Sequence, residues 1–316
     1  MIEISIVIPV FNEQDTITEL HNRLQASVSS ITPNYELIFV NDGSKDFTLL
    51  KLIELAEHDH RVKYISFSRN FGHQIALSAG SDHCKGKAVV IIDGDLQDPP
   101  ELIPALYKRF MEGYEVVYAR RTKRRGENLF KRTTAKLFYR IMKRMTSFDF
   151  PLDVGDFRLV DRKIVEYLKQ MPEQNKFLRG QTAWLGFRQT FVDFERDSRK
   201  AGRTGYPLVK MIRLALDGIT AFSDAPLRLV TNLGLSISLC AFIIILYALY
   251  SHYFLHQTIT GWTSLIISSM FIGGIQLLSI GIIGEYISRI NSNVRNRPLY
   301  IVEKTNVDSK EGGSSN

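Results

Sequence analysis

Residues 88–100 read Ala-Val-Val-Ile-Ile-Asp-Gly-Asp-Leu-Gln-Asp-Pro-Pro, and they contain one complete repeating unit of the predicted fold. The apolar, mostly β-branched run Ala88–Ile92 predicts a buried strand. Polar residues follow at once in Asp93-Gly94-Asp95, and Pro99-Pro100 suits the first turn of a helix. A buried strand, a polar loop and a helix in succession are typical of a parallel α/β sheet.

The same unit recurs on both sides of this stretch. Further strands are predicted at Ile2–Val10, Tyr35–Val40, Val62–Ser68 and Glu115–Ala119. Helices are expected between them, starting at Asn12, at Asp46 and at Gly72. This alternation predicts an α/β fold, Rossmann-like, with a mainly parallel sheet covered on both faces.

Polar side chains follow the predicted strands where ligands bind in such sheets, beyond the carboxyl ends of the strands. This repeated placement predicts a nucleotide site. The residues concerned are Asn12, Glu13, Asp42, Arg69, Asn70, Asp93, Asp95 and Arg120.

The triplet Asp93-Gly94-Asp95 offers two carboxylates one residue apart at a strand end. Hard divalent cations such as Mg²⁺ or Mn²⁺ prefer oxygen ligands, and such an ion would neutralise charge on a nucleotide diphosphate. Most such triplets are solvated turns, and the position after the fourth predicted strand favours the metal interpretation here. Asp42 and Glu13 have a competing interpretation as helix-capping residues.

The chain of 316 residues has a net charge of +7, with basic clusters at 123–125, 131–132 and 196–203. No aromatic RNA-binding signature or zinc finger accompanies the charge, so no nucleic-acid partner is predicted. Anionic lipid headgroups and phosphorylated substrates are the expected partners. Cys84 lies in the predicted soluble part and Cys240 in an apolar segment, which excludes a disulfide framework. No signal peptide is expected, because Ile2–Val10 already reads as a buried strand.

Two apolar segments, about 229–250 and 264–283, are each long enough to span a membrane. The loop between them lacks Lys and Arg, whereas Arg228, Arg289, Arg295 and Arg297 flank the pair. By the positive-inside rule, the catalytic domain and both termini are predicted to be cytoplasmic, in a multi-pass protein of the cell membrane.

The expected domains follow from these features. Residues 1–205 form the α/β domain, 206–227 an interfacial amphipathic helix, 228–290 a two-helix anchor, and 291–316 a cytosolic segment with a disordered end. The amphipathic pattern also suits a core helix of the soluble domain, and this alternative stays open.

Several motifs together resemble the family 2 glycosyltransferases. They are Val-Ile-Pro-Val-Phe-Asn-Glu at 7–13, Asn-Asp-Gly-Ser at 41–44, Asp-Gly-Asp-Leu-Gln-Asp-Pro-Pro at 93–100 and Gly-Asp-Phe-Arg at 155–158. Ser-Arg-Asn-Phe-Gly at 68–72 and Gly-Ile-Ile-Gly-Glu-Tyr-Ile-Ser-Arg-Ile at 281–290 make the likeness narrower. They resemble the bacterial polyprenyl-phosphate glycosyltransferases of the GtrB and CsbB type, relatives of dolichyl-phosphate mannose synthase.

The resemblance implies a GT-A fold and a set of site residues. Binding of the nucleotide-sugar is implied for Pro9, Val10, Glu13, Asp42, Asp93, Gly94 and Arg120. Metal binding, by Mg²⁺ or Mn²⁺, is implied for Asp95 and Gln97, and acceptor-phosphate binding for Arg132, Arg199 and Arg203. Asp156 is implied as the catalytic base, with Asp93 beside the reacting sugar.

The role of Asp156 requires a qualification on physical grounds. A phosphate monoester has its second pKa at ~6, so a polyprenyl phosphate is already largely ionised near neutrality. Asp156 is therefore expected to orient a substrate or accept a residual proton, or else to cap the turn before Phe157. The larger catalytic need is electrostatic: two anions must approach each other and a diphosphate must depart.

The predicted reaction is an inverting transfer of glucose, N-acetylglucosamine or N-acetylgalactosamine from a UDP-sugar to undecaprenyl (polyprenyl) phosphate. The lipid-linked sugar would serve modification of a cell-envelope polymer, and the resemblance implies a homo-oligomer, a tetramer. Alternatives are another lipid acceptor such as diacylglycerol, or a non-catalytic membrane scaffold. A transporter is disfavoured, because two spans without a central charged residue are too few for a conduit.

Overall fold

The computed structural model describes residues 1–121, 154–194, 225–254 and 261–307. Two compact units are present: Met1–Leu208 with Arg297–Asn316, and Val209–Asn296. The predicted interfacial helix at 206–227 falls almost entirely outside the described residues, as does the tail 308–316. Both stay predictions.

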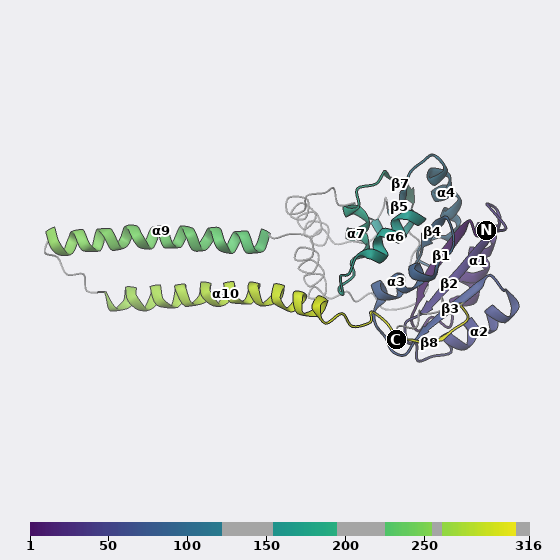
Figure 1. Cartoon of the computed structure of the whole chain (residues 1–316), viewed down its shortest axis with the longest axis horizontal. Coiled ribbons are helices and arrows are strands. Elements are labelled where there is room, and N and C mark those ends of the chain that lie inside the picture. Colours follow the sequence, from purple (N-terminus) through teal and green to yellow (C-terminus); the bar gives the residue numbers. More distant parts are fainter. Residues whose placement is uncertain (122–153, 195–224, 255–260, 308–316) are drawn as a thin grey trace, which may run out of the picture. The chain divides into compact units, whose positions relative to one another are not determined.

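The first unit contains an eight-stranded sheet with the strand order β7-β5-β6-β4-β1-β2-β3-β8 (Figure 1). The strands β1 to β5 are the five predicted ones, so the α/β prediction is confirmed. The bounds are Ile4–Val10 (β1), Tyr35–Asn41 (β2), Val62–Phe67 (β3), Ala88–Ile91 (β4), Val116–Arg121 (β5), Val154–Asp161 (β6), Gln189–Phe194 (β7) and Val302–Thr305 (β8).

Helices cover both faces of the sheet, as Figure 1 shows. Because successive side chains of a strand point to opposite faces, β1 contributes Ile6 and Ile8 to one core and Val7 to the other. Helices α1, α2 and α4 pack on the first face, and α3, α6 and α7 on the second. The bounds are Ile17–Ser29 (α1), Thr48–His58 (α2), His73–His83 (α3), Ile103–Met111 (α4), Arg162–Gln170 (α6) and Leu178–Trp184 (α7).

The first helix begins five residues later than the sequence suggested, so the predicted start at Asn12 was wrong. Asn12 has a φ of 56°, which is outside the helical region, and its side-chain Oδ1 accepts a hydrogen bond from the Lys45 backbone N–H at 2.9 Å. Helix α1 starts at Ile17. The delay leaves residues 11–16 as a loop at the carboxyl end of β1.

The sheet is mixed rather than wholly parallel. Strand β6 lies antiparallel between β4 and β5, and Ile91 of β4 pairs with Arg158 of β6. The pairs of β1 with β2 and β4, of β2 with β3, and of β5 with β7 are parallel. The antiparallel strand carries Asp156 to the carboxyl end of β4, because 156 lies opposite 93 when this register is continued.

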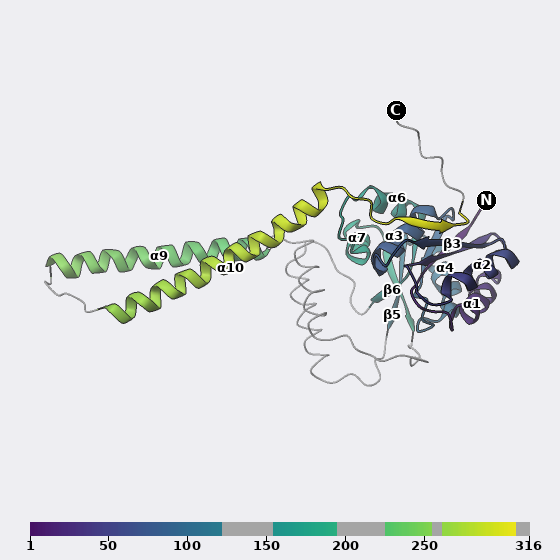
Figure 2. The ribbon, with the colours of Figure 1, turned by 90° about the horizontal axis from the view of Figure 1, so that it is seen from below.

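A strand near the end of the chain completes the sheet, which the sequence did not predict. Strand β8 pairs antiparallel with β3 (Figure 2), so the β3 edge is not left open. The Asn306 side chain accepts from the Tyr64 N–H at 2.7 Å and donates to the Val62 carbonyl at 3.1 Å. The Tyr300 ring stacks on Phe67 with centroids 5.1 Å apart. Residues 300–307 are therefore part of the α/β unit.

The second unit contains the long helices α9 (Ala225–Phe254) and α10 (Trp262–Val294). Two segments, Pro226–Ile244 and Ser268–Val294, are long and apolar enough to cross a membrane, and they overlap the predicted spans. Their large apolar side chains are exposed: Leu229 by 65 % and Leu277 by 72 %. Continuous apolar exposure of this kind suits a hydrocarbon environment better than water.

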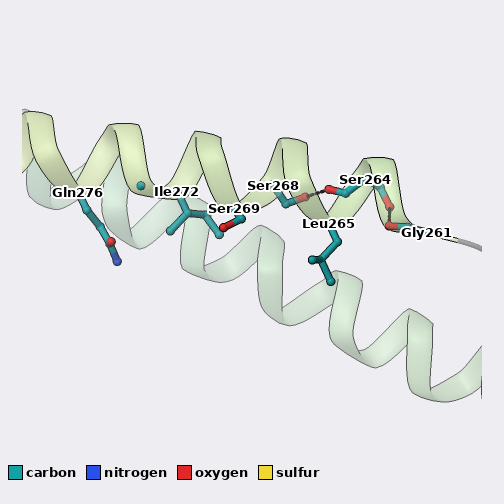
Figure 3. A pocket seen from close by; sticks show the side chains of 8 residues that line it. Gly261, Ser264, Leu265, Ser268, Ser269, Ile272 and Gln276 are labelled. Atoms are coloured by element: carbon teal, nitrogen blue, oxygen red, sulfur yellow. Dashed lines mark hydrogen bonds between the residues drawn. The ribbon is translucent and has the colours of Figure 1, made fainter.

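A shallow groove runs along α10 and is lined in part by serines (Figure 3). The Ser268 hydroxyl donates to the Ser264 carbonyl at 2.7 Å, and the Ser264 hydroxyl donates to the Gly261 carbonyl at 2.9 Å. Hydroxyls on a span need partners, since a bare polar group in hydrocarbon is costly. These two find them within their own helix.

The contact of Asn306 with the edge of β3 can be tested by stability. Asn306→Ala removes two hydrogen bonds to the β3 backbone, which at ~1 kcal/mol each should lower the unfolding free energy by roughly 2 kcal/mol. Thermal unfolding of the full-length protein in detergent should show a lower Tm. Lys304→Ala, an exposed residue of the same strand, is the control. Equal Tm values for both variants would contradict a stabilising role for this return strand.

Candidate active site

The loop after β4 lies directly against the end of β1. A Cβ placed on Gly94 would come within 2.8 Å of Val10 Cγ1 and 2.9 Å of the Pro9 carbonyl oxygen, so only glycine fits there without a shift. The Thr16 hydroxyl also donates to the Gly94 carbonyl at 3.2 Å. The structure thus brings together Pro9, Val10 and Gly94, three predicted nucleotide-site residues. They meet between β1 and β4, where the strand order reverses and such folds bind ligands.

The predicted metal residues follow in the same loop. The Asp95 carboxylate accepts the Gln97 backbone N–H at 3.1 Å, and Leu96 between them has a φ of 59°, so the chain turns sharply here. Carboxylate and amide oxygens suit Mg²⁺ or Mn²⁺. Within the described residues, no group of three His, Cys, Asp or Glu side chains is placed to hold a metal. Metal binding by Asp95 and Gln97 stays a prediction.

A histidine connects Asp93 to Asp156. The Nε2 atom of His73, the first residue of α3, lies 3.4 Å from Asp93 Oδ1 and 3.3 Å from Asp156 Oδ2. The two carboxylates come from neighbouring strand ends, β4 and β6, so the register of the sheet sets their approach. Burial raises the pKa of Asp93, the carboxylates of Asp156, Asp98 and Asp95 raise it further, and His73 opposes the rise.

Asp156 is surrounded by donors and cations. Gln74 donates to its Oδ2 at 3.2 Å, Arg158 donates to its Oδ1 at 3.3 Å, and Arg179 lies 3.7 Å from Oδ1. Arg158 itself is fully buried. Burial alone would raise the pKa of Asp156, but the His73 hydrogen bond and the arginine charges hold that pKa well below its usual range. A carboxylate stabilised this strongly is a poor proton acceptor, which favours orientation and electrostatics over general-base catalysis.

Asp42 holds the loop between β3 and α3. Its carboxylate accepts the Phe71 N–H at 2.6 Å and the Gly72 N–H at 3.0 Å, and only 4 % of the residue is exposed. The alternative that Asp42 caps the next helix is wrong, because Asp46 accepts from the Thr48 N–H instead. Its predicted contact with a nucleoside stays a prediction.

Glu13 lies in the loop before α1. Its carboxylate accepts the Thr16 hydroxyl at 3.0 Å, and the same hydroxyl reaches the Gly94 carbonyl. The Glu13 backbone carbonyl accepts the Thr16 N–H at 3.0 Å. Glu13 is thereby linked to the loop after β4, beside the other predicted nucleotide-site residues.

Arg120 lies near the end of β5. Its guanidinium forms a two-pronged pair with Asp193, at 2.6 and 3.0 Å, and lies over the Phe191 ring. Arg121 donates to Asp98 at 3.2 Å and lies beside Gly155. Successive strand residues face opposite sides of a sheet, so Arg120 lies on the face that carries Asp156 and Arg121 lies on the other face. The predicted contact of Arg120 with the nucleotide-sugar stays a prediction. Arg132, Arg199 and Arg203 lie outside the described residues.

The sequence did not point to four residues whose side chains contact Asp93 or Asp156: His73, Gln74, Arg158 and Arg179. Two of them had a signal, since Arg158 ends the quoted Gly-Asp-Phe-Arg motif and His73 follows Ser-Arg-Asn-Phe-Gly directly. Nothing local in the sequence marks Arg179, which reaches the site from α7.

Comparison with known proteins agrees with this geometry. Residues 5–168 match the family described as "Glycosyl transferase family 2", which is more than half of the chain. The chain belongs to this family. Residues 225–290 match the "GtrB C-terminal hairpin", so the two long helices also have a family counterpart.

Relatives resemble the chain over almost its full length. An uncharacterized glycosyltransferase of Bacillus subtilis, YkcC, is 52 % identical and the alignment covers 96 % of this chain and 94 % of the relative. The SfII prophage-derived bactoprenol glucosyl transferase of Shigella flexneri is 40 % identical, with 96 % and 98 % covered. The solved glucosyl-3-phosphoglycerate synthase of Mycobacterium tuberculosis, in complex with Mn²⁺, UDP and phosphoglyceric acid, has a TM-score of 0.50 at 20 % identity. That alignment covers 69 % of this chain and 76 % of the synthase, and it agrees with a GT-A fold.

The contrast between the two adjacent arginines gives a prediction. Arg121→Ala removes an ion pair made by the fully buried Asp98 and should lower the unfolding free energy by roughly 3 kcal/mol. Arg120→Ala breaks an exposed pair with Asp193, worth about 1 kcal/mol or less, and serves as the matched control. Thermal unfolding of both variants checks the order. A larger loss of Tm in Arg120→Ala would contradict the assignment of Arg121 to the buried side.

Proposed function

We propose that this glycosyltransferase moves a hexosyl group, glucose in the first instance, from UDP-sugar to a polyprenyl phosphate such as undecaprenyl phosphate. The observation that carries the proposal is the extent of the likeness to proteins named bactoprenol glucosyl transferases. It covers 95–96 % of this chain, both the α/β unit and the helical hairpin. A likeness confined to the α/β unit would have left the acceptor open.

The donor would bind at the carboxyl ends of β1 and β4. Pro9, Val10 and Gly94, which pack against one another, would lie beneath it, and Glu13 and Asp42 would contact it. Asp95 and Gln97 would hold Mg²⁺ or Mn²⁺ there, and a bound ion would stabilise the departing diphosphate. The Mn²⁺ and UDP in the Mycobacterium tuberculosis synthase belong to that protein, and they make the same ligands reasonable candidates here.

The acceptor's phosphate would attack the anomeric carbon directly, and a single displacement inverts the configuration. Because the phosphate is already largely ionised near pH 7, the reaction needs little proton transfer. This agrees with an Asp156 carboxylate whose pKa is held low by His73, Arg179 and Arg158. Its role is to hold the geometry of the site and to accept a residual proton at most.

The helical hairpin would anchor the enzyme at the cytoplasmic face of the cell membrane. The spans, with a loop free of Lys and Arg and with basic flanks, support cytoplasmic termini. An anchored enzyme and an acceptor whose tail lies in the bilayer share one surface, which reduces the entropic cost of their encounter. A homo-oligomer, a tetramer, would complete the assembly. The product would donate its sugar to a cell-envelope polymer.

A transfer assay tests the reaction. Purified full-length protein in detergent is given undecaprenyl phosphate, a divalent cation and one radiolabelled UDP-sugar at a time, with diacylglycerol as a second acceptor. We expect label from UDP-glucose to enter the polyprenyl lipid. Chelation and Asp95→Ala should abolish this transfer, whereas Glu101→Ala, an exposed surface change, should not. Transfer to diacylglycerol alone, or none with any UDP-sugar, would refute the proposed reaction.

The part played by Asp156 is tested in the same assay. Asp156→Asn should lower kcat roughly 10- to 100-fold without abolishing transfer, because geometry is disturbed but the acceptor is its own nucleophile. Residual activity should rise as the pH passes ~6, where the acceptor loses its last proton. Asp161→Asn, on the same strand and capping α6, is the control. Complete loss at every pH, with UDP-sugar binding intact, would establish Asp156 as an essential base.

A further inference from the structure

The proposed reaction assigns no role to His73, although its side chain lies at the candidate site. It begins α3 directly after Gly72, which has a φ of 106°, a conformation that side chains rarely adopt. The ring lies between two carboxylates that are less exposed than itself: His73 is 43 % exposed, Asp93 26 % and Asp156 12 %. One side of the imidazole is therefore open while its Nε2 is engaged.

Burial and the repulsion between the two carboxylates raise the pKa of Asp93, and a cation between them would offset that repulsion. Both lie within 3.4 Å of the same nitrogen, and like charges held this close repel unless a positive group intervenes. Arg158 and Arg179 approach Asp156 at its other oxygen, Oδ1. Of the side-chain contacts among the described residues, only those of His73 join Asp93 to Asp156.

The surroundings of His73 favour its charged form. Asp93 faces it from the end of β4, Asp156 and Arg158 from β6, and Asp42 interacts with it from the end of β2. Burial lowers the pKa of the ring and Arg158 lowers it further, but the hydrogen bond to Asp156 and the charges of Asp93 and Asp156 raise it overall. The imidazolium is thus present at low pH and is lost as the pH rises through this raised pKa.

We propose that His73 is a positioning residue for glycosyl transfer, holding the Asp93 and Asp156 carboxylates together and offsetting their charge where the acceptor phosphate approaches. The proposal rests on the proposed function, since the anionic acceptor makes the offset necessary. Without the His73 charge, a phosphate dianion brought beside Asp93 and Asp156 would meet more negative charge at the point of reaction. His73 transfers no proton and forms no bond to the sugar in this role.

The kinetic test compares variants of the full-length protein in detergent. His73→Ala should lower kcat roughly 10- to 100-fold while the KM for UDP-glucose changes by less than about three-fold, because donor contacts are made by other residues. His73→Gln keeps an N–H donor without the charge and should recover part of the lost kcat. His83→Gln, a histidine at the other end of the same helix whose ring contacts the Ala79 carbonyl, should match wild type.

The dependence of kcat on pH distinguishes a positioning role of His73 from a role in folding alone. Wild-type kcat should fall as the pH rises through the pKa of His73, and this fall should be absent in His73→Gln, whose amide does not titrate. Unchanged kcat in His73→Ala across about pH 6 to 9 would overturn the proposal. A rise in KM without loss of kcat would also overturn it, because it would make His73 a donor-binding residue.

A second measurement needs no activity. The pKa of the His73 imidazole can be followed by NMR in histidine-labelled protein, with His73→Gln assigning the resonance. Asp156→Asn should lower that pKa, whereas Asp161→Asn should leave it unchanged. An unchanged pKa in Asp156→Asn would refute the contact on which the proposal depends. If the wild type transfers no sugar but this shift is observed, the proposed function fails while the His73–Asp156 contact stands.

Discussion

Three buried or half-buried carboxylates meet at the carboxyl ends of β2 and β4 and the amino end of β6, and each needs compensation. Burying a charge is costly unless donors or opposite charges surround it. Asp42 is compensated by two backbone N–H groups at the start of α3, Asp156 by two arginines and an amide, and Asp93 by His73. Groups at the start of α3 therefore contact all three carboxylates. This explains why hydrogen bonds fix the loop before α3.

A buried carboxylate cannot both be held firmly in its ionised form and act as a strong base. The cations that keep Asp156 ionised in a buried place also make it a weak base. Such a residue is less suited to removing a proton from a hydroxyl nucleophile. A phosphate acceptor removes the need, so the electrostatic environment of Asp156 and the proposed chemistry of the acceptor are mutually consistent.

Much of the fold could be predicted because it depends on local patterns. Strands β1 to β5 are apolar runs that end in polar loops, and the structure confirms them. The later strands lack this signal. Strand β6 carries Asp156 and Arg158 within an otherwise apolar run, and all four residues of β8 are exposed. Pairings between residues more than 200 positions apart leave no trace in local periodicity.

The candidate site was predictable where a motif fixed the backbone, as in the contact of Gly94 with Pro9 and Val10. The site was not predictable where its contacts depend on the direction in which a side chain points. Arg120 and Arg121 are adjacent and chemically identical, and only the pleat of β5 sends one toward Asp98 and the other toward Asp193. A single histidine such as His73 likewise forms no motif that can be recognised in a sequence.

The position of His73 follows from a constraint on the backbone rather than on its own chemistry. Asp42 binds the N–H groups of Phe71 and Gly72, and this fixes where α3 begins. The next residue then lies at the carboxyl end of β4 and the amino end of β6. A small or acidic residue there would remove the group that lies between Asp93 and Asp156. The buried Asp42 thus acts beyond its own loop, because the hydrogen bonds that it accepts also determine which side chain lies beside Asp93 and Asp156.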